Sequence, residues 1–177
     1  MIAVNLLDAV INEMRELFSD YTLPNKNGVL QKVKIFAQYV PLPQSITLTN
    51  KAIGLKNYDE DDYEANFPCI IVRYDSSIDN EERRLEMTTH NVNIMFGVYS
   101  EERECQAWRD VMNMIDIVRT KFLTYRILEN RYRLNMPVKS QFLDADTWPV
   151  YFGLMNLVFE SGRATQPAMF VHRRRKE

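Results

Sequence analysis

Cysteine, glycine and long hydrophobic runs are all scarce in this sequence. The 177 residues include two cysteines, Cys69 and Cys105, which are too few for a disulfide framework. Both lie in apolar patterns, which predicts buried free thiols and a reducing compartment. The five glycines do not cluster, which argues against a glycine-rich phosphate-binding loop. The longest apolar stretch, residues 148–159, is too short to span a membrane. The N-terminal segment carries Asp8 and Glu13 and lacks the basic region of a signal peptide, so we expect the protein to be made in the cytoplasm.

The charge of the chain is unevenly distributed. The net charge is −2, but residues 163–177 hold five basic residues and one acidic residue, whereas the rest holds 17 basic and 23 acidic residues. The length suits one domain. We therefore predict a single acidic domain at residues 1–162, followed by a basic C-terminal tail at residues 163–177. Such asymmetry points to contacts with other copies, other proteins or a polyanion, without choosing among them.

Hydrophobic periodicity predicts a mixture of helices and strands. The expected helices are residues 3–18 and 101–123, and the expected strands are residues 29–40, 69–74, 84–99, 131–136 and 150–160. Residues 44–66 indicate at most a short additional strand, and residues 76–82 read as a polar connection. The order predicts an α+β fold in two layers, a mainly antiparallel sheet with flanking helices and a protruding β-hairpin. The last strand is apolar on both parities, which is typical of a central strand covered on both faces.

The hairpin has an unusual apolar pattern. In the second strand, Leu85 and Met87 occupy odd-numbered positions, whereas the apolar residues from Val92 to Val98 occupy even-numbered positions and so belong to the opposite face. A strand alternates with period two, so this change requires a bulge or a change in what covers the strand. We interpret the inner half of the hairpin as core and the outer half, Tyr74 to Met87, as an arm. Tyr74, Leu85 and Met87 are the predicted contacts with an adjacent subunit.

Motifs for catalysis or cofactor binding are missing. The sequence contains no P-loop, dinucleotide-binding fingerprint, HExxH or CxxC motif, so we expect no cofactor, no metal and no enzymatic activity. The alternative is a small cysteine hydrolase in which His90 takes the thiol proton of Cys69 from a neighbouring strand. No third orienting residue accompanies the pair, which favours two unrelated core residues. Trp108 and Met112 belong to the apolar stripe of the second predicted helix and read as core packing rather than a ligand pocket.

Two short runs of like charge are candidate contact sites. The acidic run extends from Asp59 to Glu64, with Asp59, Glu60, Asp61 and Asp62 as its candidate contacts, and the basic run comprises Arg173, Arg174, Arg175 and Lys176. The acidic run lacks the ligand spacing and the glycine of a calcium loop, so an exposed loop is favoured. The basic run can contact DNA phosphates, solubilise the chain, or dock on another subunit together with Met169, Phe170 and Val171. We expect at least one run to contact another protein, because complementary charge fixes register at interfaces.

The second half of the chain resembles a known family. FPCIIVR opens the hairpin, VNIMFGVYS continues directly into EERECQAWRDVMNMIDIVRTKFL, and RILENRYRLNMPV and WPVYFGLMNLVFE complete the sheet. This arrangement resembles the tail terminator, or tail completion, proteins of tailed phages and phage-derived contractile bacteriocins. The resemblance covers residues 67–160 and, more loosely, the N-terminal helix. Its most specific part is the Tyr-Ser-Glu-Glu step from strand into helix. Residues 41–66 and the chain after Gly162 lie outside it.

The resemblance implies a structural function in the virion tail or neck. Proteins of this family form a sixfold ring that caps the head-proximal end of the tail tube, stops its polymerisation and offers a surface to the neck or head connector. The implied partners are further copies of the chain, the tube protein, the sheath where the tail has one, neck or head-connector proteins, and DNA that passes through the lumen without sequence-specific contacts. The family implies no catalytic residues and no membrane. Assembly in the cytoplasm of a bacterial host follows. The alternative within the same particle is a head–tail connector or a tube subunit.

Overall fold

The structure is a computed structural model, and it describes residues 2–40, 64–82, 85–101, 106–143 and 148–162. The elements in chain order are α1 (Ile2–Leu17), β1 (Thr22–Pro24), β2 (Leu30–Lys32), β3 (Lys34–Ala37), β4 (Cys69–Glu82), β5 (Leu85–Tyr99), α3 (Gln106–Thr124), β6 (Ile127–Leu128), β7 (Tyr132–Phe142) and β8 (Val150–Gly162). The short strands β1 and β2 form a separate two-stranded antiparallel sheet. Its turn is held by the Asn25 side chain, which accepts hydrogen bonds from the backbone amides of Asn27 and Val29 at 2.9 and 3.0 Å.

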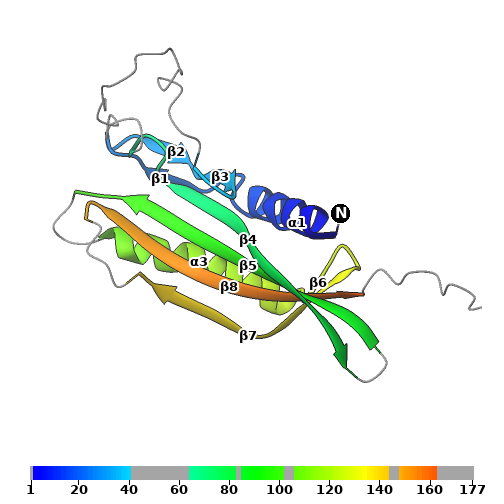
Figure 1. The fold of residues 1–177 in the computed structure, drawn as a ribbon. Coiled ribbons are helices and arrows are strands. Elements are labelled where there is room, and N and C mark those ends of the chain that lie inside the picture. Colours follow the sequence, from blue (N-terminus) through cyan, green and yellow to red (C-terminus); the bar gives the residue numbers. More distant parts are fainter. Residues whose placement is uncertain (1, 41–63, 83–84, 102–105, 144–147, 163–177) are drawn as a thin grey trace, which may run out of the picture.

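The main sheet has six strands in the order β3-β4-β5-β8-β7-β6. All neighbouring pairs are antiparallel except β3 and β4, which are parallel. The sheet is curled, and α1 and α3 lie against it (Figure 1). One apolar core joins the buried residues of both helices to one face of the strands. The predicted α+β fold, with a mainly antiparallel sheet, is therefore confirmed.

Both helices bury one apolar stripe against this sheet face. The fully buried side chains of α1 include Leu6, Val10 and Met14, at the spacing of successive helical turns. In α3 the buried residues are Ala107, Val111, Met114, Ile115, Val118 and Phe122. The helix approaches β8 so closely that a methyl group on Gly153 would lie 2.6 Å from a methyl carbon of Val111. The absence of a side chain at this position therefore permits the packing of helix on sheet.

The centre of the α3 stripe differs from the prediction. Trp108 and Met112, which we expected in the core, are 39% and 42% exposed. Met114 takes the buried position, which turns the helix so that Trp108 lies at the surface, with the Arg109 guanidinium 5.4 Å from its ring centroid. The described helix begins at Gln106, and the predicted residues 102–105, including Cys105, lie outside the described part of the chain.

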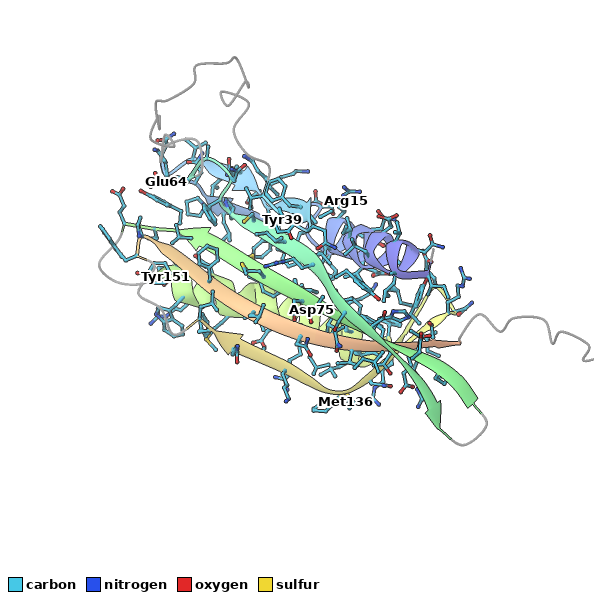
Figure 2. The ribbon with its side chains drawn as sticks, viewed as in Figure 1. Arg15, Tyr39, Glu64, Asp75, Met136 and Tyr151 are labelled. Carbon is cyan, nitrogen blue, oxygen red and sulfur yellow. The ribbon has the colours of Figure 1, made fainter. Side chains whose placement is uncertain are left out.

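Two strand predictions outside the hairpin were wrong in their extent. The predicted strand 29–40 is divided at Val33 into β2 and β3, which belong to different sheets. The strand expected to end before Pro137 continues through it as β7 to Phe142. Its pairing with β8 shifts register between Asn135 and Lys139, and Met136 in this interval is 53% exposed (Figure 2). A proline cannot donate a ladder hydrogen bond, so the strand tolerates Pro137 where the ladder is interrupted.

Candidate functional site

The hairpin of β4 and β5 is the longest feature of the sheet. The two strands pair from Cys69 opposite Gly97 to Glu82 opposite Leu85. Their far end protrudes beyond α1 and α3 (Figure 1). Strand β8 accompanies β5 as far as Met87, which pairs with Gly162, so most of the protruding part has three strands. The polar stretch 76–82, predicted as a connection, is part of β4.

A β-bulge lies midway along the hairpin. Tyr74 pairs with Val92 and Ser76 pairs with Asn91, so Asp75 has no partner of its own (Figure 2). The bulge lies in β4, whereas the pairing of β5 with β8 continues without a register shift. The extra residue reverses the parity of β4 at this point, so that Ser76 and Ile78 lie on the sheet face away from the helices. For the strand with the changed apolar pattern, the prediction was a bulge or a change in what covers it. Strand β5 pairs with β8 without a bulge, and the bulge lies in the other strand of the hairpin, β4.

The helix-covered face continues past the bulge with polar residues. Thr88 and His90 are 7% and 3% exposed, and they follow the parity of Val92 and Ile94. The apolar residues of β5 therefore switch to the other face of the strand because the buried face carries polar side chains here. Met87 is half-buried on the opposite face, where Ile78 of β4 is 55% exposed.

A chain of hydrogen bonds crosses the sheet at His90. Its Nδ1 lies 2.9 Å from the Tyr74 hydroxyl on β4, and its Nε2 lies 2.9 Å from the Ser161 hydroxyl on β8. The His90 ring also contacts the edge of Tyr132 on β7, with the centroids 6.4 Å apart. Burial lowers the pKa of His90, and the charge of Asp79 partly opposes this effect. The imidazole is therefore a neutral core group that joins three strands and contacts a fourth.

This cluster was not identified from the sequence. Its members lie on three strands, and Ser161 is 71 residues from His90. A serine hydroxyl next to an imidazole is the geometry of an activated nucleophile. Ser161 is 5% exposed and His90 is 3% exposed, which leaves no access for a substrate. One signal in the sequence could have indicated the cluster. Thr88 and His90 are polar, yet they continue the alternation of Val92 and Ile94 and therefore lie on the buried face of the strand.

The predicted subunit contacts have different environments. Tyr74 is half-buried, packs against the core of its own chain and hydrogen-bonds His90. Met87 is half-buried at the end of the β5–β8 pairing. Leu85 pairs with Glu82 in the backbone register, but its side chain lies outside the described residues. The structure therefore leaves the exposed Ile78 and Met87, rather than Tyr74, as the more accessible apolar groups of the arm.

Cys69 and His90 do not form a pair. Cys69 is opposite Gly97, whereas His90 is opposite Ser77, so the two lie far apart along the hairpin. They also belong to separate regions: Cys69 lies in a small cluster with Phe67 and Tyr99, on the other face of the sheet. Burial raises the pKa of the Cys69 thiol to about 12, so it stays protonated at neutral pH. The geometry required by the cysteine-hydrolase alternative is not present.

The sheet face away from the helices is partly apolar. In β8, the predicted double covering is only partial, because Phe152, Leu154 and Val158 on this face are half-buried. Phe67 packs edge-to-face on Phe152 at 5.8 Å and covers one end. The middle is polar, and the Asn156 amide donates a 2.9 Å hydrogen bond to the Asn93 side-chain oxygen. Exposed and half-buried apolar groups on this face are therefore grouped at its two ends, around Phe152 and around Ile78.

The two charged runs lie outside the described residues. This applies to Asp59 to Asp62 and to Arg173 to Lys176. Glu64, the last residue of the acidic run, is described and forms an ion pair with Lys26 at 3.1 Å (Figure 2). Within the described ranges, no group of three or more acidic, histidine or cysteine side chains is arranged to hold a metal ion. No helix of the described part is long and apolar enough to cross a membrane.

Comparison with known proteins adds no identification to this geometry. No protein-family model matches the sequence, and no curated protein matches it.

Proposed function

We propose that this chain is a non-enzymatic structural subunit that assembles into a ring and caps the head-proximal end of a phage-type tail tube. In that position it ends polymerisation of the tube and provides the surface for the neck or head connector. The resemblance of residues 67–160 to the tail terminator proteins of tailed phages motivates the assignment. The proposed partners are other copies of the chain, the tube protein, the sheath where the tail has one, and the neck or connector proteins, with DNA passing through the lumen.

The observation that carries the proposal is the protruding hairpin. Ile78 is 55% exposed on β4, and the half-buried Met87 lies on the same face of the sheet. An exposed strand pair with apolar side chains is a surface for another protein chain. The His90 hydrogen bonds hold this arm to β8 in a fixed direction. A rigid arm is suited to a repeated contact, because little conformational entropy is lost when it binds.

A ring also requires a second, different surface. In a heterologous interface, one patch of each subunit contacts another patch of the next, and a closed ring results if the rotation closes. The apolar end of the helix-free face, around Phe152, lies far from the arm, because Phe152 pairs with Gly97 at the end of the hairpin opposite Leu85. The separation of these two patches supports a head-to-tail contact rather than a symmetric dimer.

The test is to locate the chain in particles and to measure its mass alone. We expect a ring of this protein at the head-proximal end of purified tails in electron micrographs. Tails assembled without it should have tubes of uncontrolled length. Copurification with heads in place of tails would favour the head–tail connector, and distribution along the tube would favour a tube subunit. A protein that stays monomeric, binds no tails and leaves tube length unchanged would contradict the proposal.

A further inference from the structure

A groove lies between the two helices, on the side of the helix layer that faces away from the sheet. It has a volume of about 720 Å³ and is lined by Leu17 and Tyr21 beside α1 and by one side of α3 from Asn113 to Tyr125. Leu17, Tyr21 and Ile117 are half-buried, and Tyr125 is 65% exposed. This volume is within the range that a few bulky side chains occupy in binding clefts. The groove is therefore a candidate docking site for an apolar segment.

The rim of this groove is acidic. Asp116 lines it and is exposed, and Glu16 is exposed on the adjoining part of α1. Lys121 is a cation at the rim, but its ammonium forms an ion pair with Glu13 at 2.8 Å. A partner for this site should combine apolar side chains with positive charge.

The C-terminal segment of the same chain has this chemistry. Met169, Phe170 and Val171 form an apolar triplet, and Arg173 to Lys176 follow it after a single residue, His172. The order matches a groove with an apolar floor and an acidic rim.

The starting point of the segment brings it within reach. Glu160 on β8 pairs with Arg133 on β7, which pairs with Ile127 on β6, two residues from Tyr125 at the end of the groove. The path from Tyr125 to Gly162 consists of two residues along the chain to Ile127, two strand spacings of about 4.8 Å from β6 to β8, and two residues from Glu160 to Gly162. The two residues therefore lie within roughly 25 Å of each other. Seven extended residues from Gly162 to Met169 span about 24 Å. The triplet can therefore reach the groove of its own chain.

We propose that residues 169–175 dock in the groove between α1 and α3 of the same chain, with the apolar triplet against Ile117 and Tyr125 and the arginines at the rim beside Glu16 and Asp116. Tethering gives the segment a high effective concentration, so a modest interaction is sufficient to hold it. This assignment does not depend on the ring proposed above. In this arrangement the basic run is held by its own domain and is not offered to DNA or to a separate partner.

The test is cross-linking between two introduced cysteines in a chain that carries Cys105→Ala. Thr120→Cys lies in the groove and is paired with Phe170→Cys. The matched control pairs Phe170→Cys with Met112→Cys, an exposed position on another side of α3 that lines a different hollow. With a short bismaleimide, we expect the groove pair to form an intramolecular link at least about tenfold faster than the control, at a rate independent of protein concentration.

Each other outcome bears directly on the proposal. Equal rates for the two pairs would overturn it, because the segment would then have no preferred position. Linked dimers whose yield rises with protein concentration would overturn the assignment to the same chain and place the segment on a second copy. Replacing Arg173, Arg174 and Arg175 with glutamine should slow the groove reaction several-fold, as should salt. No change with these variants would overturn the proposed role of charge. Circular dichroism of each variant confirms that the fold is intact.

Discussion

The imidazole Nε2 of His90 lies 2.9 Å from the Ser161 hydroxyl, and this contact joins β5 to β8 inside the buried layer at the base of the arm. The other ring nitrogen contacts Tyr74 on β4, so one side chain connects the three strands that form the protruding region. Because His90 is buried, its protonation state determines whether this connection is stable.

Stability should depend on pH through His90. The folded-state pKa is below the ordinary value of 6.5, so the unfolded chain binds a proton more readily. The contribution of this group is therefore fully present above pH 6.5 and is lost as the pH falls from there through the lower folded-state pKa. Urea denaturation at about pH 7.5 and about pH 5 should show a smaller free energy of unfolding at the acidic value. His90→Gln keeps hydrogen-bonding groups but does not titrate, so it should reduce this difference. An unchanged pH dependence would show that other groups cause it.

The contact between α3 and β8 should not tolerate a larger residue at position 153. Gly153→Ala places a methyl group 2.6 Å from Val111 and 2.7 Å from Ile115, so one element must shift. We expect a destabilisation of about 1–3 kcal/mol, typical of overpacking. Gly162→Ala is the matched control, because its added methyl group has no heavy atom within 4 Å, and it should change stability by less than about 0.5 kcal/mol. Chemical denaturation of both variants measures the difference. Equal stabilities would mean that the helix moves away at no cost.

Cys69 should be dispensable for function. Cys69→Ala should leave capping of tails intact and lower the free energy of unfolding by roughly 1 kcal/mol, because it removes buried volume beside Phe67.

His90→Ala, alone or combined with Cys69→Ala, should also retain activity in particles assembled at permissive temperature. It should lower stability by about 1–3 kcal/mol, since Tyr74 and Ser161 lose their partner. The readouts are particle activity and the denaturation midpoint. Fully assembled but inactive particles from either variant would contradict a purely structural function.

The outer part of the hairpin should be required for assembly. Leu85→Asp with Met87→Asp places charge on the protruding arm, so we expect a folded monomer that cannot cap tails. Burying an unpaired carboxylate in a subunit contact costs several kcal/mol. The matched control is Val4→Asp with Val29→Asp, which adds the same charge at positions that are 54% and 60% exposed outside the hairpin. Light scattering and micrographs of tails provide the measurement. Normal assembly of the hairpin variant would remove the arm from the interface.

Local sequence patterns were sufficient for the class of fold. The apolar spacing of α1 and the alternation of β5 each bury one side of an element, and this requirement determines helix or strand almost independently of context. The change of apolar parity between Met87 and Val92 predicted a bulge in this strand or a change in what covers it. Buried polar Thr88 and His90 account for the change, whereas the bulge lies in β4 at Asp75. These predictions succeeded because they depend on neighbours a few residues apart.

The tertiary structure decided what depends on contacts between distant residues. The polarity of residues 76–82 indicates a connection when read alone, but pairing with β5 makes them strand, because Thr88 and Asp79 satisfy each other by a 2.7 Å hydrogen bond. The exposure of Trp108 depends on which residues of α3 meet β8, and the small Gly153 selects Val111 and Ile115 for that contact. The partner of His90 was likewise decided by register, since Ser161 reaches it only through the pairing of β5 with β8. Sequence determines which faces are apolar, but the strand register and helix rotation that bring particular side chains together are set by packing across the whole sheet.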